Sequence, residues 1–420
     1  MVLRSNDINE SVWGDRFNSV KSLRERTLGD PPEAYGPIRH SKRRPHAVSP
    51  IRVTILSRLR KSAQTSRKWY GTPSLAIHGT AHDGVKKMDD RFGPDAGLHR
   101  QMYEEVGPRI AAGPWHWFHW LFARGPSRPF VANLILACVE CELKLPGLGW
   151  ALIRDVASIS GREKNEADYE SLLQKLSEIF VLRQLLVLPW PEGTTFAHEP
   201  AAGPGGKRPE LKAETNDALY LFEVKAPSLL SHQRSRSENP VQFPGRMFEG
   251  AMRKMMAGDQ KPILPRDNPV KDFLMSAEAK FAPFAGEKSV YGILIVVWDD
   301  FIYEPITSLV HEASKGLLTA ETFARNGDGT PITFPHVDAV FLIRHLMYFQ
   351  QGAAETLTER RHAFDFGGER DLPNVHVPVP GGKEVPGFIR AGLRALQFDD
   401  EQLQNFADYR PQEFIMWFNT

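Results

Sequence analysis

Residues 208–225, RPELKAETNDALYLFEVK, are the most informative segment of the sequence. It contains two strand-like pieces, and Asn216-Asp217 between them supplies turn-forming residues. A two-residue turn there places Glu210 directly opposite Glu223, with the Cβ atoms about 5 Å apart. Asn-Asp is a fair turn pair rather than the strongest one, so a register shifted by one residue stays open. The stretch therefore predicts a β-hairpin that brings two carboxylates together.

The second strand of this hairpin also carries a lysine. Side chains alternate across a strand, so Glu223 and Lys225 are expected on one face, with Phe222 and Val224 on the other. Like charges directly opposite each other destabilise a sheet, so the carboxylate pair needs a compensating cation. Mg²⁺ prefers oxygen ligands, and a neighbouring lysine can orient an attacking water or stabilise charge on a phosphate. An exposed strand face with a surface ion pair is the alternative interpretation.

The flanking sequence alternates between helical and strand-like patterns, which is typical of an α/β fold. Before the hairpin, apolar residues follow helical spacing, and this helix is expected to end before Pro189. The most apolar run, 290–298, is β-branched and unbroken, which predicts a central strand covered on both faces. The predicted elements are helices at 172–186, 245–257, 305–318 and 401–406, and strands at 194–199, 208–215, 218–225, 290–298, 337–343 and 375–379.

The chain divides by composition into four parts. Its N-terminal part is rich in Pro, Gly, Arg and Ser, and residues 34–82 contain ten Lys or Arg and no acidic residue. Apolar helical patterns follow, including one at 130–145. We therefore expect a basic arm at 1–95, a helical extension at 96–155, an α/β core at 156–350 and a C-terminal extension at 351–420.

Cysteine usage and hydropathy indicate the compartment. Two cysteines among 420 residues make no disulfide framework, which suits a reducing cytosol. The first eleven residues include Arg4, Asp7 and Glu10, where a signal peptide would have an apolar run. The longest apolar runs, 131–139 and 292–298, are much shorter than the roughly 18 residues of a membrane span. We expect a cytoplasmic protein without membrane association.

The order of these features resembles the PD-(D/E)XK nuclease superfamily, over about residues 165–300. A helix, three strands, a Pro-acid dipeptide at the second strand and Glu-x-Lys at the end of the third strand carry the resemblance. Pro209-Glu210 matches the Pro-Asp position, and Glu223-Val224-Lys225 matches the acid-x-Lys position. The resemblance implies a restriction-endonuclease-like fold, in which a mixed central sheet is flanked by helices.

The resemblance also implies roles for individual residues. Glu210, Glu223 and the Val224 carbonyl would bind Mg²⁺, with Mn²⁺ as an alternative ion, and Lys225 would lie next to the nucleophilic water. Many relatives carry a further glutamate on the preceding helix.

Glu178 is the best match to this helical glutamate, and Glu199 in the first strand is a second candidate. Glu210 stands where aspartate is usual in the superfamily, and its extra methylene leaves an impaired site open.

These features predict a Mg²⁺-dependent nuclease that cleaves phosphodiester bonds in DNA, with RNA as a second substrate and homo-oligomerisation left open. By superfamily habit its setting is restriction, defence or repair. The alternative is a catalytically inactive module of the same fold that binds nucleic acid or acts as a scaffold.

Other polar groups have less specific interpretations. A zinc site is one interpretation of four residues, although their apolar neighbours favour core packing; the four are His116, His119, Cys138 and Cys141. The basic block 39–68 is either a solvated tail or an arm that contacts phosphates. Five further basic residues follow the third strand and are candidates to line the groove in which a nucleic acid would bind: Arg234, Arg236, Arg246, Arg253 and Lys254. Asp299 and Asp300 are expected to be turn residues.

Overall fold

The computed structural model describes residues 95–416 apart from short internal gaps. The gaps are 113–115, 160–164, 203–205, 240, 247–249, 251–252, 255–256, 259–261, 265–266, 287, 355, 359 and 369–370. The described residues all belong to one compact unit. The expected basic arm lies outside the described residues, except for Asp95.

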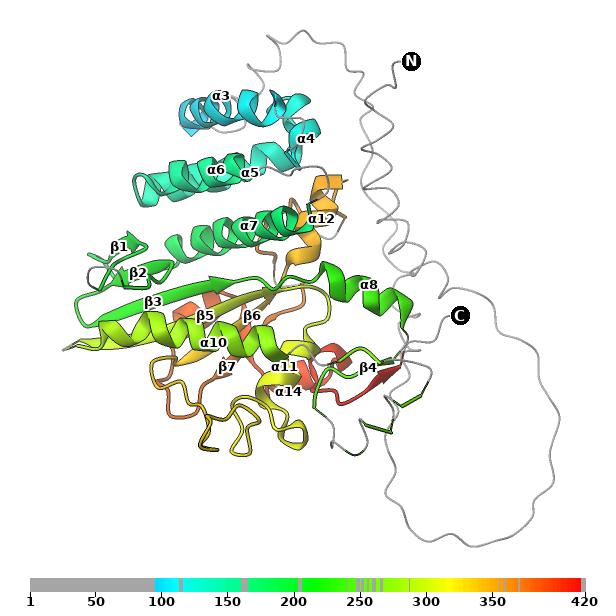
Figure 1. Ribbon diagram of the computed structural model, residues 1–420. Helices are drawn as coiled ribbons and strands as arrows, with labels where there is room; N and C mark the ends of the chain where they lie inside the picture. Colours follow the sequence, from blue (N-terminus) through cyan, green and yellow to red (C-terminus); the bar gives the residue numbers. More distant parts are fainter. Residues whose placement is uncertain are drawn as a thin grey trace, which may run out of the picture. The chain divides into compact units, whose positions relative to one another are not determined.

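A seven-stranded mixed sheet lies at the centre of this unit, in the order β1-β2-β3-β5-β6-β7-β8 (Figure 1). Strands β1 to β3 are antiparallel, β3, β5 and β6 are parallel, β7 is antiparallel to β6, and β8 is parallel to β7. The strands are β1 Thr195–His198, β2 Leu211–Glu214, β3 Ala218–Lys225, β5 Ser289–Trp298, β6 Ala339–Arg344, β7 Asn374–Pro378 and β8 Ala395–Gln397. The chain after residue 350 thus adds two strands to the same sheet.

Strand β5 is central, as its apolar sequence predicts, and residues 292–298 are all buried. Parallel strands need a crossover connection, and α10 (Asp267–Phe281) lies in the crossover from β3 to β5. Helix α10 is not among the helices predicted from the sequence. Pro269 lies in the first turn of α10, where a backbone N–H has no helical partner, so proline does not interrupt the helix.

Helices cover both faces of the sheet (Figure 1). On one face α7 packs against β3, and the remaining N-terminal helices stack behind α7. On the other face α10 packs against β5 and β3, with α11 beside it. The N-terminal helices are α3 Ala96–Ala112, α4 His119–Ala123, α5 Pro129–Lys144, α6 Leu148–Ser158 and α7 Glu166–Leu186. The later elements are α8 Leu230–Glu238, β4 Val241–Gln242, α11 Tyr303–Val310, α12 Leu346–Ala354, α13 Gly387–Gly392, α14 Glu401–Gln404 and β9 Ile415–Met416.

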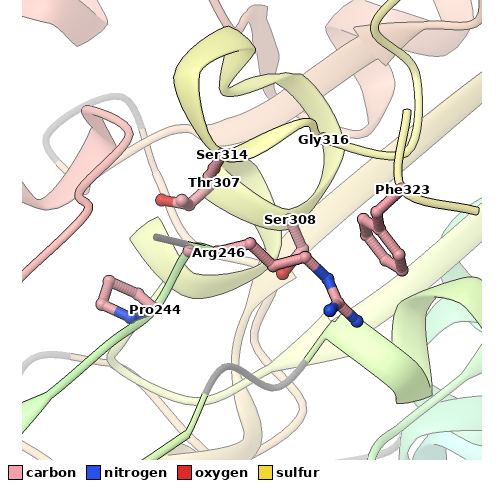
Figure 2. A pocket seen from close by; sticks show the side chains of 8 residues that line it. Pro244, Arg246, Thr307, Ser308, Ser314, Gly316 and Phe323 are labelled. Carbon is pink, nitrogen blue, oxygen red and sulfur yellow. The ribbon is translucent and has the colours of Figure 1, made fainter. Parts of the chain in front are cut away.

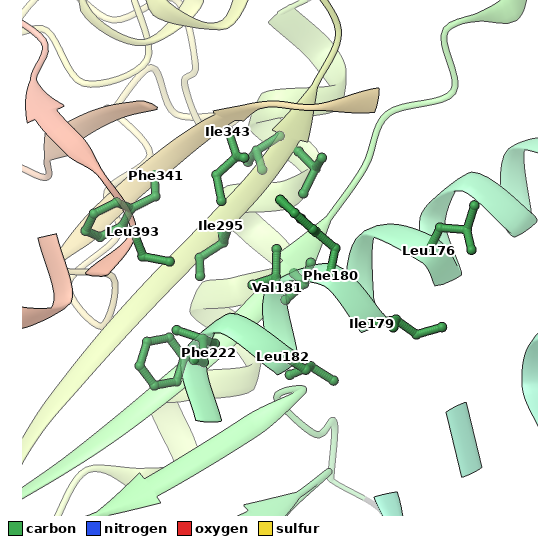
Figure 3. Packing of buried hydrophobic residues seen from close by; sticks show 14 of the residues in the cluster. Leu176, Ile179, Phe180, Val181, Leu182, Phe222, Ile295, Phe341, Ile343 and Leu393 are labelled. Atoms are coloured by element: carbon green, nitrogen blue, oxygen red, sulfur yellow. The ribbon is translucent and has the colours of Figure 1, made fainter. Parts of the chain in front are cut away.

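Helix α7 has the local signals of a well-defined helix. Its N-cap residue Asn165 accepts a hydrogen bond from the Ala167 N–H, and acidic residues lie in its first turn. It ends at Leu186, before Pro189, as predicted. Its apolar residues pack against the sheet near Phe222 and Ile295 (Figure 3). Because Phe222 faces α7, the alternation along β3 directs Glu223 to the face that α10 covers.

A buried group of polar side chains around Glu304 links α8, β4, β5 and α11. The buried Glu304 of α11 accepts hydrogen bonds from Gln242 of β4, from Trp298 of β5 at 3.3 Å and from Arg236 of α8 at 3.2 Å. Arg236 also packs its guanidinium over the Phe301 ring, 3.5 Å from the ring centroid. One carboxylate thus joins four elements.

Most predicted elements agree with the structure to within a few residues. The helix expected at 305–318 ends earlier, at Val310, because the chain turns at Lys315 (φ 56) and the Leu317 N–H pairs back with the Ser308 carbonyl. The helix expected at 245–257 falls partly outside the described residues. No helix among the described residues has both the length and the apolar content that crossing a membrane requires.

Candidate functional site

The hairpin of β2 and β3 has the predicted register. The Thr215 N–H donates to the Ala218 carbonyl at 2.9 Å, so Asn216-Asp217 is the turn. The ladder ends at the pair Leu211–Phe222, and the Glu210 N–H, one residue before β2, donates to the Phe222 carbonyl at 2.9 Å. Lys280 Nζ lies 3.6 Å from Glu210 Oε1 and 2.6 Å from Glu223 Oε1. The two carboxylates therefore lie together, and the one-residue shift is excluded.

Glu223 is a buried carboxylate held by two lysines. Its side chain is 0% exposed. Lys225 Nζ lies 2.6 Å from Glu223 Oε1, and Lys280 Nζ of α10 lies 2.6 and 2.8 Å from the two carboxylate oxygens. Lys280 also lies 3.6 Å from Glu210 Oε1. The interpretation as an exposed surface ion pair is therefore wrong, because a fully desolvated carboxylate needs such partners.

Glu178 joins the same group from α7. It is buried and forms an ion pair with Lys175, which also contacts Asp155 at 3.0 Å. Burial raises the pKa of Glu178, and the positive charges of Lys175 and Lys225 oppose this rise. Glu178 thus lies within electrostatic range of the hairpin. We call Glu178, Glu210, Glu223, Lys225 and Lys280 the charged cluster.

The carboxyl group of Glu210 has a strongly raised pKa. Burial, followed by the charges of Glu178 and Glu223, raises its pKa from 4.5 to about 7, although Lys280 and Lys225 lower it. Near neutral pH Glu210 therefore exchanges a proton easily, and a cation placed beside it would favour the ionised form.

The end of β1 adds two residues that sequence reasoning did not combine. The Glu199 N–H donates to the Glu210 carbonyl at 3.1 Å, and Glu199 has φ 43, in the left-handed region. One ligand atom from each of His198, Glu199 and Glu210 lies within 4.8 Å of the other two. Burial lowers the pKa of His198, which favours the neutral imidazole. The structure therefore brings the second candidate, Glu199, to Glu210. His198 follows from the pairing of β1 with β2, which places it opposite Leu211, the residue after Glu210.

The donor atoms of the hairpin fit a divalent cation. Carboxylates and a backbone carbonyl make a hard oxygen set, which suits Mg²⁺. The Phe222 carbonyl accepts the Glu210 N–H, so it points toward β2. Carbonyls two residues apart along a strand point to the same edge, so the Val224 carbonyl also points to the β2 side, past the paired residues of that strand. The ammonium of Lys280 beside Glu210 and Glu223 shows that this place already accepts a cation.

Two of the basic residues expected to line the groove are engaged elsewhere. Arg234 forms an ion pair with Glu166, and Arg236 is buried beside Glu304. The two residues lie two positions apart in α8, on different faces of the helix, and therefore contact different carboxylates. Arg246 packs over the Phe323 ring at 3.7 Å, whereas Arg253 and Lys254 are exposed. The basic block 39–68 lies outside the described residues.

The residues considered for zinc are packed in the helical part. Cys138 and Cys141 are buried, unpaired thiols in α5, and burial raises the pKa of both. His116 contacts the Val156 carbonyl at 2.8 Å. Among the described residues, the potential metal group is instead His198, Glu199 and Glu210. Core packing, the interpretation favoured from sequence, agrees with this arrangement.

The strand end after β5 behaves as a turn, as predicted. Asp299 accepts the Phe301 N–H at 3.0 Å, and Asp300 pairs with Arg344 at 2.7 Å.

A small crevice beside α11 is lined by Gly245, Arg246, Thr307, Ser308, Ser314, Gly316, Phe323 and Pro244 (Figure 2). It contains no member of the charged cluster.

No protein-family model, curated protein or solved structure matches this chain. The function is therefore inferred from the geometry of the charged cluster.

The raised pKa of Glu210 predicts a pH-dependent stability. Because the folded pKa is about 7 and the ordinary value is 4.5, the protonated form is favoured by folding, and this contribution is lost as pH rises through 7. Without metal, Glu210→Gln should therefore be more stable than wild type at pH 8 by about 3 kcal/mol, and the gap should close at pH 5. Urea unfolding in EDTA at both pH values measures this difference.

Glu214→Gln is the matched control on the same strand. Hydrogen bonds from Lys288 and Lys212 lower the pKa of Glu214 to about 2, so its replacement should give no stabilisation at pH 8. An equal pH response of the two variants would contradict the assignment of a raised pKa to Glu210.

Proposed function

We propose that this chain is a metal-dependent nuclease that hydrolyses phosphodiester bonds in DNA. The observation that carries the proposal is the meeting of Glu210, Glu223 and Lys225 at one buried point of a β-hairpin. Two carboxylates beside an amine are the groups that bind a divalent ion and stabilise a phosphate during hydrolysis.

The order of elements around this point supports a restriction-endonuclease-like fold. Helix α7 precedes the antiparallel strands β1, β2 and β3, and the crossover containing α10 leads to the parallel strand β5. This order is similar to that of the PD-(D/E)XK superfamily named above. Glu210 and Glu223-Val224-Lys225 occupy the positions at which that superfamily has its active residues.

Each residue of the proposed site has a separate task. Glu210, Glu223 and the Val224 carbonyl would hold Mg²⁺ or Mn²⁺. When bound, the ion supplies a water of lowered pKa and neutralises charge on the scissile phosphate. Lys225, fixed beside Glu223, is placed to orient that water or to donate a hydrogen bond to a phosphate oxygen. Glu178 adds negative charge near Glu210, which favours cation binding.

The choice of DNA as substrate comes from the resemblance and from the basic residues of the chain. The basic block 39–68 supplies sequence-independent attraction to a polyanion. Arg253 and Lys254 are exposed and remain candidates for phosphate contact. A positively charged substrate would find no comparable attraction.

A cleavage assay on the full chain tests the proposal. We expect end-labelled single- or double-stranded DNA to be cut with Mg²⁺ or Mn²⁺, and to stay intact with EDTA. The same assay shows whether single- or double-stranded DNA is preferred. A labelled RNA tests whether RNA is also cleaved. Cleavage that persists in excess EDTA, or no cleavage with either ion, would reject a metal-dependent nuclease.

An inactive nucleic-acid-binding module is the second candidate. It is favoured by Glu210 in place of aspartate and by the two lysines that already hold Glu223. Isothermal titration with Mn²⁺ separates the candidates, because the nuclease requires metal binding that depends on these carboxylates. DNA binding without such metal binding would support the module.

A further inference from the structure

Lys280 contacts more carboxylate oxygens of the charged cluster than Lys225 does. Its ammonium lies 2.6 and 2.8 Å from the two oxygens of Glu223 and 3.6 Å from Glu210 Oε1. Lys225, by contrast, contacts Glu223 through Oε1. Lys280 therefore bridges the two carboxylates that face each other across the hairpin.

Without a metal ion, the two carboxylates need the positive charge of Lys280, because both are withdrawn from solvent. Glu223 is fully buried, and the side chain of Lys280 is only 14% exposed. Two carboxylates at such a place repel each other, and burial removes the water that would screen them. A single positive charge that contacts both carboxylates relieves both costs, which is also what a divalent ion would do.

We propose that Lys280 is an internal counter-ion, which occupies the cation position of the site and must be displaced before a divalent metal binds. The proposal rests on the metal site of the proposed function and adds its regulation. An ammonium group and a metal ion cannot share the same oxygens, so the two compete for Glu210 and Glu223.

The position of Lys280 allows this displacement. It lies in the last turn of α10, next to Phe281, which is buried. A lysine has a flexible four-carbon stem and a point charge, so its ammonium can leave the carboxylates while the helix stays in place. Lys225 lies on β3 itself, which keeps it beside Glu223. Lys280 thus acts on metal affinity, and we regard it as a positioning residue rather than a catalytic one.

Metal affinity of the full chain tests the proposal without any activity measurement. Mn²⁺ is titrated into wild type, Lys280→Met and Lys280→Gln, with free Mn²⁺ followed by electron paramagnetic resonance and heat by calorimetry. We expect both variants to bind Mn²⁺ about tenfold or more tightly than wild type, because the competing charge is gone. Lys280→Gln keeps a hydrogen-bond donor for Glu223, which protects folding where methionine does not.

Two matched variants control for general effects of charge and packing. Lys288→Met removes an exposed lysine that pairs with Glu214 at 2.8 Å, and its Mn²⁺ affinity should equal that of wild type. Lys280→Arg keeps the positive charge, so its affinity should not exceed that of wild type. Circular dichroism and thermal unfolding establish that each variant is folded.

The outcomes separate this inference from the proposed function. Tighter binding in Lys280→Met or Lys280→Gln, including binding that wild type lacks, supports the inference. Equal or weaker binding in the folded neutral variants, with wild type binding Mn²⁺, overturns the inference alone. Absence of binding in every variant overturns both the inference and the metal site.

Discussion

Glu223→Gln is expected to lower metal-dependent DNA cleavage by about 10²- to 10³-fold or more, the range seen when one charge-stabilising group is removed from an active site. Glutamine keeps the size of the side chain, so the hairpin and its register should persist. It removes the negative charge that holds Lys225 and Lys280 at 2.6 Å and that a divalent ion requires. Initial rates at saturating Mg²⁺ measure the loss, and calorimetry with Mn²⁺ should show weakened binding.

Glu214→Gln is the control for this prediction. Glu214 lies on the neighbouring strand, is exposed to solvent and pairs with Lys212 and Lys288. Ion pairs of this kind contribute little, so its cleavage rate should match wild type within about twofold. If Glu223→Gln cleaves as fast as Glu214→Gln, Glu223 has no part in catalysis and the proposed site is wrong.

Glu304→Ala should destabilise the protein by about 3–5 kcal/mol, the cost of removing one partner from a buried ion pair. Glu304 is 1% exposed, and among the described carboxylates its loss leaves Asp299, 3.8 Å away, as the ion-pair partner of the buried Arg236 guanidinium. It also removes the acceptor for Gln242 and Trp298, which are themselves buried. Unsatisfied buried donors of this kind add to the cost.

Urea unfolding of the full chain measures this change. The exposed Glu321 provides the control, and Glu321→Ala should change stability by less than about 0.5 kcal/mol. Glu304→Gln should lie between the two, because it keeps a hydrogen-bond acceptor but removes the charge. A change below about 1 kcal/mol in Glu304→Ala would show that the group is not coupled to the stability of the fold.

The hairpin could be predicted from sequence because its determinants are local. A two-residue turn at Asn216-Asp217 sets the register, and once the register is set Glu210 comes next to Glu223 at the end of the ladder. Alternation along β3 then places Lys225 with Glu223. The apolar run of β5 likewise identified the central strand, because only a strand covered on both faces has this composition.

Helix α10 shows where such reasoning fails. Pro262 and Pro265 precede it and Pro269 lies in its first turn, so no helix was predicted there, although Val270, Leu274, Ala277 and Phe281 follow helical spacing. The parallel pairing of β3 with β5 requires a crossover, and the helix forms where that crossover can bury its apolar face on the sheet. Lys280 was missed for the same reason, since no pattern within its own helix indicates a neighbour 57 positions earlier in the chain.

The sequence by itself determined the α/β class, the hairpin register and the three residues at the centre of the proposed site. All of these depend on contacts between residues close in the chain or on the period of a single element. Tertiary structure alone decided the burial of Glu223, the raised pKa of Glu210 and the bridge made by Lys280. Those properties depend on which distant helix covers the strand, because charge is desolvated and paired only when the packed layers meet.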